Sequence, residues 1–156
     1  MKISIKNIMC PVDFSDSSDH ALRYATALAE AHGANLCLLH VVQPPMATMP
    51  SDPLLPEFAA DIMKEAVEAS REQLKKLADD IESDLPNVTT ETATGTPFLE
   101  IITAARLQDI DLIVVGTHGR TGLAHVMLGS VAERIVRKAP CPVLTVKHPE
   151  HEFVMP

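Results

Sequence analysis

Two segments of the chain combine residue types that can bind an anion. The longer one runs from Gly116 to Ser130 and has further glycines at positions 119 and 129. Glycine lets backbone N–H groups approach a ligand closely, and a helix N-terminus, which we expect at Gly129-Ser130, attracts phosphate through its N–H groups and its dipole. This spacing therefore predicts a phosphate-binding loop.

The same stretch is free of acidic side chains. No Asp or Glu lies between Asp111 and Glu133, although the chain carries 21 acidic residues in 156 positions, and Arg120 lies inside this gap. The alternative is that the glycines only form a tight turn and that the missing acids are a coincidence. Neither G-x-x-x-x-G-K-[ST] nor G-x-G-x-x-G occurs, which disfavours Walker-type hydrolysis and dinucleotide chemistry.

The second segment, Pro11-Val12-Asp13-Phe14-Ser15, follows the first apolar run of the chain. In an open parallel sheet, ligands bind beyond the carboxyl ends of the strands, where the strand order reverses. Asp13 suits a ligand contact there but could instead cap the next helix, and Ser15 fits either role. We expect His40, near the end of an apolar run, to be a core residue bonded to backbone.

Strand and helix patterns alternate along the chain, and the strands are apolar at nearly every position, as strands covered on both faces require. This order predicts a doubly wound α/β sheet. The expected strands are Ile5–Val12, Leu36–Val42, Val88–Ala93, Ile110–Val115 and Pro142–Val146. The expected helices begin at Asp16 or Ser17, at Glu57, at Thr96-Pro97 and at Ser130, and end near His32-Gly33, Ile81, Leu107 and Lys138.

Length and composition predict one domain over residues 1–156, with a flexible proline-rich loop at about 43–56. A net charge of −8 argues against nucleic acid as a partner. The absence of an 18-residue apolar stretch or a signal peptide predicts a cytoplasmic protein without a membrane segment. Three cysteines without a CxxC pair predict buried thiols rather than disulfides, and we expect no metal site within the protein.

Four segments in order resemble the universal stress protein family, specifically its ATP-binding branch. The glycines at 116, 119 and 129 and Ser130 match the nucleotide loop G-x2-G-x9-G-[ST] of that branch. The other matching segments surround it along the chain: IMCPVDFS at 8–15, LLHVV at 38–42, DLIVVGTHGRTG at 111–122 and APCPVLTV at 139–146. The resemblance therefore covers nearly the whole chain.

This resemblance implies a Rossmann-like, five-stranded parallel sheet of order 3-2-1-4-5, with ATP or a related adenine nucleotide, and its Mg²⁺, between the ends of strands 1 and 4. By analogy, Asp13 accepts hydrogen bonds from the ribose or holds a magnesium-bound water, and Val41 packs on the adenine. The full set of implied nucleotide contacts is Pro11, Val12, Asp13, Ser15, Val41, Val115, Gly116, Gly119, Arg120, Gly129, Ser130 and Val131.

The resemblance also implies a function, an ATP-binding stress-response regulator that acts as a dimeric switch and pairs through residues 142–146. An enzyme on the same scaffold, a slow ATPase or a nucleotidyl transferase, is the alternative, and its candidate bases are Asp13 and His118. A third hypothesis, an interaction module that has lost nucleotide binding, is disfavoured by the complete loop.

Overall fold

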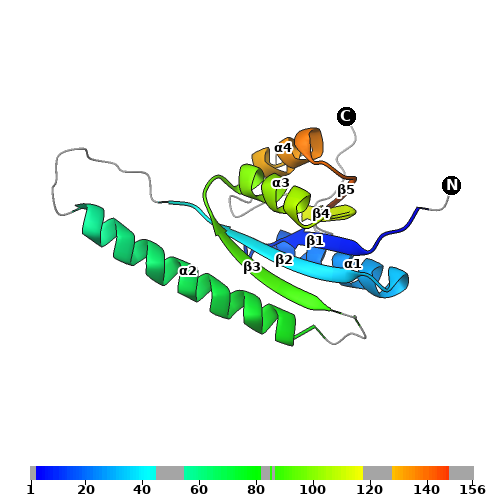
Figure 1. Ribbon diagram of the computed structural model, residues 1–156, viewed down its shortest axis with the longest axis horizontal. Helices are drawn as coiled ribbons and strands as arrows, with labels where there is room; N and C mark the ends of the chain where they lie inside the picture. Colours follow the sequence, from blue (N-terminus) through cyan, green and yellow to red (C-terminus); the bar gives the residue numbers. More distant parts are fainter. Residues whose placement is uncertain (1–2, 45–54, 82–84, 86, 118–127, 148–156) are drawn as a thin grey trace.

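Five parallel strands form one sheet in the order β3-β2-β1-β4-β5. The protein is described by a computed structural model over residues 3–44, 55–81, 85, 87–117 and 128–147 (Figure 1). Its elements are β1 (Asn7–Pro11), α1 (Asp16–His32), β2 (Asn35–Val42), α2 (Leu55–Asp79), β3 (Val88–Thr94), α3 (Pro97–Leu107), β4 (Leu112–Gly116), α4 (Ser130–Lys138) and β5 (Val143–Val146). The predicted fold and strand order are confirmed, whereas most of the predicted loop at 43–56 falls outside the described residues.

The central strand, β1, sets the register of the sheet. It pairs with β2 from Asn7↔Asn35 to Pro11↔Leu39. It pairs with β4 through Ile8↔Leu112 and Met9↔Ile113. Because all neighbouring strands are parallel, their carboxyl ends meet at one edge of the sheet. Residues that follow β1, β2 and β4 are therefore brought together.

Helices cover both faces of the sheet, α1 and α2 on one side and α3 and α4 on the other (Figure 1). Helices α1 and α2 enclose one apolar cluster with Ile8, Leu38 and Val114, and α3 and α4 enclose another with Met9 and Ile113. The continuous apolar runs of the central strands follow from this double coverage, since alternate side chains enter opposite clusters. None of the helices within the described ranges is long and apolar enough to cross a membrane.

Helix α1 begins at Asp16, one of the two predicted starts. Ser15 is the N-cap, one of its two predicted roles, because its backbone is extended and its hydroxyl accepts a hydrogen bond from the Ser18 N–H at 3.3 Å. The helix ends as predicted, at Gly33 in the left-handed conformation.

The cysteines are free thiols in apolar surroundings, as predicted. Burial raises the pKa of Cys10 to about 12 and that of Cys37 to about 11. Burial also raises the pKa of the half-buried Cys141. All three side chains are therefore protonated and poorly nucleophilic at neutral pH.

Gly116 ends β4 directly beneath the first turn of α1. A Cβ atom at this position would lie 2.5 Å from the Ser17 Oγ and 2.7 Å from the Ser17 carbonyl oxygen. The side chain of Ser17 could rotate away, but its backbone could move only with the helix. Close packing of strand against helix therefore requires glycine here, independently of any ligand.

We expect Gly116→Ala to lower the free energy of unfolding by roughly 1–3 kcal/mol, the usual cost of overpacking. Gly33→Ala is a useful comparison, because a Cβ at Gly33 meets nothing within 4 Å and only the left-handed backbone is strained, which costs roughly 1–2 kcal/mol. Urea unfolding followed by circular dichroism measures both. Wild-type stability for Gly116→Ala would show that α1 is free to shift away from β4.

Candidate functional site

A cavity of about 630 Å³ opens at the carboxyl edge of the sheet. Its walls come from the ends of β1, β2 and β4, the first turns of α3 and α4, and the middle of α2. Every predicted site residue within the described ranges lines it, with the exception of Ser15: Pro11, Val12, Asp13, Val41, Val115, Gly116, Gly129, Ser130 and Val131. Segments more than 100 residues apart in the chain thus meet in one cavity.

The remaining predicted residues have different outcomes. Ser15 is not part of the cavity wall, and its hydroxyl is engaged in capping α1 and in donating to the Asp13 carboxylate. Gly119, Arg120 and His118 lie outside the described residues. The capping role of Ser15 is therefore observed, whereas the roles of the other three stay predictions.

The turn that carries Asp13 is held from both sides. The Val12 N–H donates to the Leu39 carbonyl at 2.8 Å, and Val12 continues the buried core at the end of β1. Asp13 Oδ1 accepts hydrogen bonds from the N–H of Ser15, at 3.1 Å, and from its hydroxyl. The carboxylate is therefore oriented by its own turn before any ligand binds.

His40 fixes the same turn from β2. Its Nδ1 lies 2.7 Å from the Val12 carbonyl oxygen, and because a carbonyl only accepts, Nδ1 carries the proton. The Phe14 ring packs on the imidazole with centroids 4.6 Å apart, and Phe14 has a left-handed φ of 61°. His40 is thus the buried, backbone-bonded residue that the sequence predicted, and it also lines the cavity.

The two ends of the glycine-rich loop are tied together at its base. The Gly129 N–H donates to the Thr117 carbonyl at 2.7 Å, and the Thr117 N–H donates to the Val146 carbonyl at 3.0 Å. Gly129 is the N-cap of α4 and offers no side-chain hydrogen bond, and the first turn of the helix lines the cavity. An anion in the cavity would therefore meet the N-terminal end of α4.

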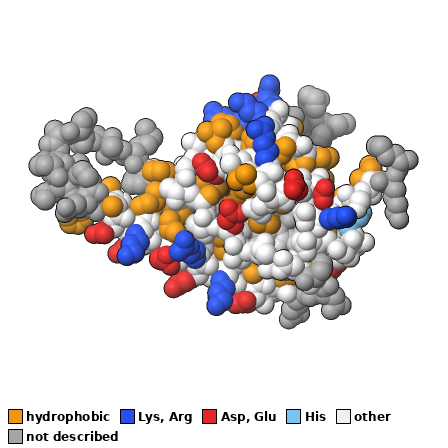
Figure 2. Space-filling view, in the orientation of Figure 1, with side chains coloured by type: hydrophobic (Ala, Val, Ile, Leu, Met, Phe, Trp, Pro, Cys, Tyr) orange, Lys and Arg blue, Asp and Glu red, His pale blue; other side chains and the backbone are white. Residues whose placement is uncertain are grey.

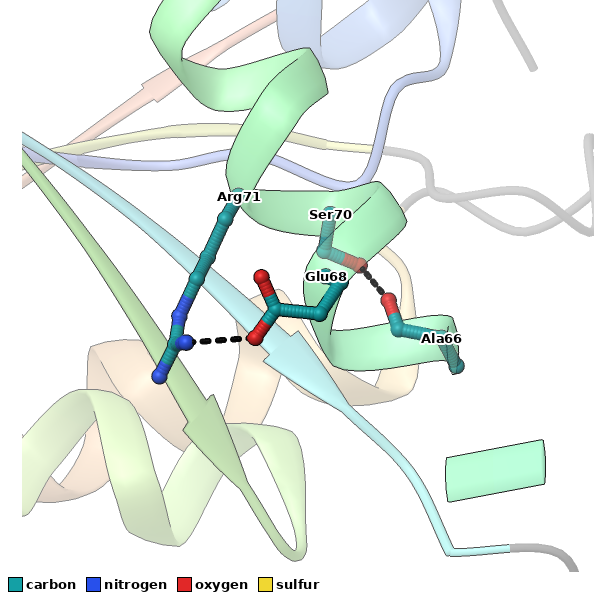
Figure 3. A network of polar contacts seen from close by, with 4 residues as sticks. All are labelled: Ala66, Glu68, Ser70 and Arg71. Atoms are coloured by element: carbon teal, nitrogen blue, oxygen red, sulfur yellow. Dashed lines mark hydrogen bonds and ion pairs between the residues drawn. The ribbon is translucent and has the colours of Figure 1, made fainter. Parts of the chain in front are cut away.

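The α2 wall of the cavity was missed by the sequence reasoning, which named no residue of this helix as a site residue. Ala66 and Ser70 line the cavity from successive turns, and the Ser70 hydroxyl donates back to the Ala66 carbonyl at 2.7 Å (Figure 3). The exposed ion pair of Arg71 with Glu68, at 2.6 Å, lies elsewhere on the helix (Figure 3). Two small residues four positions apart lie on one side of the helix and leave room beside the sheet, but the same pattern also occurs in a packed core, so it gave no usable signal.

The cavity combines apolar walls with one negative charge. Asp13 is the single carboxylate among its described lining residues, whereas Val41, Val115 and Ile101 supply apolar surface. Within the described ranges no group of three or more His, Cys, Asp or Glu side chains is placed to hold a metal ion. The arrangement suits a ligand with a flat apolar ring, hydroxyl groups for Asp13, and an anion for α4.

Known proteins share this sequence and fold along nearly the whole chain. The profile of the universal stress protein family matches residues 4–147. The chain is 36% identical to universal stress protein MJ0531 of Methanocaldococcus jannaschii over 148 residues, 94% of this chain and 85% of the relative. The structure of MJ0577 from the same organism matches with a TM-score of 0.81 and 28% identity, over 95% of this chain and 99% of the other.

Two more distant structures have the same fold. One is a universal stress protein in complex with cAMP, at a TM-score of 0.64 and 23% identity over 92% of this chain and 98% of the other. The second is the Arabidopsis thaliana family protein At3g01520 with AMP bound, at a TM-score of 0.61 and 21% identity over 93% of each chain. The profile match and the identity to MJ0531 together show that this chain belongs to the universal stress protein family.

Proposed function

We propose that this protein is a regulator that binds ATP, or a related adenine nucleotide, in the cavity at the carboxyl edge of the sheet. The observation that carries the proposal is the meeting of Asp13, Val41 and the first turn of α4 around one cavity of about 630 Å³. That volume is in the usual range for small-molecule sites. Adenine nucleotides bound to two proteins of the same fold, cAMP in one and AMP in the other, support the choice of ligand.

Each part of the nucleotide has a suitable partner. The apolar side chain of Val41 would pack on the adenine, and the oriented carboxylate of Asp13 would accept hydrogen bonds from the ribose hydroxyls. The phosphates would lie at Gly129 and Ser130, with Gly119 and Arg120 completing the loop around them. If Mg²⁺ accompanies the phosphates, Asp13 is the carboxylate placed to hold one of its waters.

The hydrogen bonds that Asp13 already accepts favour a regulatory function over efficient catalysis. Hydrolysis needs a base that aligns a water beside the terminal phosphate. Oδ1 of Asp13 already accepts two hydrogen bonds from Ser15, which hold the carboxylate as an acceptor for the ligand. The other candidate base, His118, lies outside the described residues, so Asp13 is the basis on which we assign the protein a binding function, with nucleotide occupancy as the signal.

The sheet edge at β5 supports pairing with a second copy. Strand β5 contains no charged residue and exposes Leu144, whereas the opposite edge strand, β3, carries threonines and Glu91. An uncharged apolar edge is a template for further strand pairing. We infer a symmetric dimer in which β5 pairs antiparallel with its counterpart about a two-fold axis.

The nucleotide cavity and this edge are joined by backbone hydrogen bonds. Gly129 at the proposed phosphate position donates to Thr117, and Thr117 donates to Val146 at the end of β5. A displacement of Gly129 on nucleotide binding would therefore be transmitted to β5 through these two hydrogen bonds. This connection supports the proposal of a dimeric switch.

Protein purified from cells should carry adenine nucleotide, visible as excess ultraviolet absorbance, because the chain has no Trp and one Tyr to mask it. Gly129→Val should purify without nucleotide, since a branched side chain would occupy the space of the phosphates. Circular dichroism checks that the variant is folded. A folded Gly129→Val protein with wild-type nucleotide content would place the ligand elsewhere.

Asp13→Ala should weaken ATP binding by about 1–3 kcal/mol, through the loss of charge-assisted hydrogen bonds to the ribose. Asp13→Asn keeps an acceptor for the Ser15 turn and should show a smaller loss. Asp16→Asn is the matched control, because it removes the same charge from an exposed residue that does not line the cavity. Calorimetric titration measures all three, and equal losses for Asp13→Asn and Asp16→Asn would mean that only overall charge matters.

Two proline variants test the dimer. The carbonyls of Pro142 and Val146 accept hydrogen bonds from β4 and from Thr117, which directly follows it. Backbone groups of alternate residues in a strand point to the same side, so those of Leu144 also face β4. The N–H of Thr145 therefore points to the open edge of the sheet. Thr145→Pro should therefore yield a folded monomer, and Leu144→Pro an unstable or insoluble protein. Light scattering reads the oligomeric state, and a monomeric wild-type protein at micromolar concentration would refute the dimer.

A further inference from the structure

A second cavity, of about 360 Å³, adjoins the first and shares part of its wall. Gln43, Pro97, Ser130 and Val131 line both cavities. The other described lining residues of the second cavity are Pro44, Gly95, Thr96, Phe98 and Arg134. None of them is acidic, and Arg134 brings a positive charge, so this annex differs in charge from the first cavity with its Asp13.

Arg134 is an exposed residue whose guanidinium packs on an aromatic ring, and in the part of the chain that the structure describes no hydrogen bond engages its donors. Its Cζ lies 4.9 Å from the centroid of the Phe98 ring, and the Lys138 Nζ lies 5.5 Å from the same centroid. A cation over a ring face interacts through its charge and leaves its N–H groups for other partners. Among the described residues no carboxylate forms an ion pair with Arg134, although its neighbour Glu133 pairs with Arg137 at 3.0 Å.

The surroundings of the annex are positive. Lys and Arg side chains gather over α4 at the top of the molecule (Figure 2), and α4 contributes Arg134, Arg137 and Lys138. One acid, Glu100, has its carboxylate beside Gly95 of the annex wall but does not line the cavity. A negatively charged group is therefore the ligand that this cavity fits.

We propose that Arg134 binds the terminal phosphates of the nucleotide and thereby selects ATP over AMP, an inference that rests on the proposed function. Ser130 lies in the wall common to both cavities, where the first phosphate would sit. Arg134 follows four residues later, about 6 Å along the axis on the same side of α4. A monophosphate ends at the shared wall, and a longer phosphate chain continues into the annex.

The test compares ATP and AMP binding to Arg134→Gln by calorimetric titration. Glutamine keeps a polar, unbranched side chain and removes the charge, so we expect ATP affinity to fall about tenfold and AMP affinity to stay unchanged. Lys138→Gln is the matched control, because it removes a charge from the same ring without touching either cavity. It should leave both affinities at the wild-type values.

Phe98→Leu tests the positioning of the guanidinium. It should weaken ATP binding less than Arg134→Gln does, spare AMP, and add no further loss in the Arg134→Gln background. Equal losses of ATP and AMP affinity in Arg134→Gln, or no loss of either, would overturn the selection of ATP.

Inorganic phosphate that binds to the AMP-loaded wild type, but not to AMP-loaded Arg134→Gln, would further support the annex as the site of the terminal phosphates. A wild-type protein that binds neither nucleotide would overturn the proposed function together with this inference, whereas the outcomes above leave the proposed function standing.

Discussion

The turn between β1 and α1 is the constraint on which the rest of the site depends. Its backbone is bonded to β2 on both sides, through the Val12 N–H to Leu39 and through the Val12 carbonyl to His40. The left-handed backbone at Phe14 costs roughly 1–2 kcal/mol, which the packing of its ring on His40 offsets. This turn sets where α1 starts, where Asp13 points and where the floor of the cavity lies.

The order of strands and helices could be predicted from the sequence, because apolar runs and helical periodicity are local properties. The strand order required the family resemblance, since no local pattern tells β4 to pair with β1. Two features of the site depend on packing between distant elements and could not be predicted from the sequence. Gly116 was interpreted as an opening for an anion, but it is also where β4 touches Ser17, and Ala66 and Ser70 have the same pattern as core residues.

The uneven distribution of charge explains how a protein with a net charge of −8 can attract an anion. Fields of exposed charges decay over about 8–10 Å at physiological salt, so an approaching phosphate responds to nearby groups rather than to the total. Helix α4 has its positive dipole end at the cavity and places Arg134 in the wall of the annex, whereas Arg137 pairs with Glu133 and Lys138 lines neither cavity. The local field at the proposed phosphate position therefore opposes that of the whole chain.

The strength of any coupling between the cavity and the β5 edge is bounded by the bonds that connect them. Each backbone hydrogen bond contributes about 0.5–1.5 kcal/mol net, and because the two bonds through Thr117 act in series, they can transmit no more than one such bond. That range lies at the lower end of allosteric coupling energies, and moving a two-state equilibrium from 1:99 to 99:1 needs about 5.5 kcal/mol. The proposed switch would therefore be graded. By linkage, pairing through β5 would change nucleotide affinity by the same factor as the nucleotide changes pairing, so protein concentration and nucleotide concentration would act on one shared equilibrium.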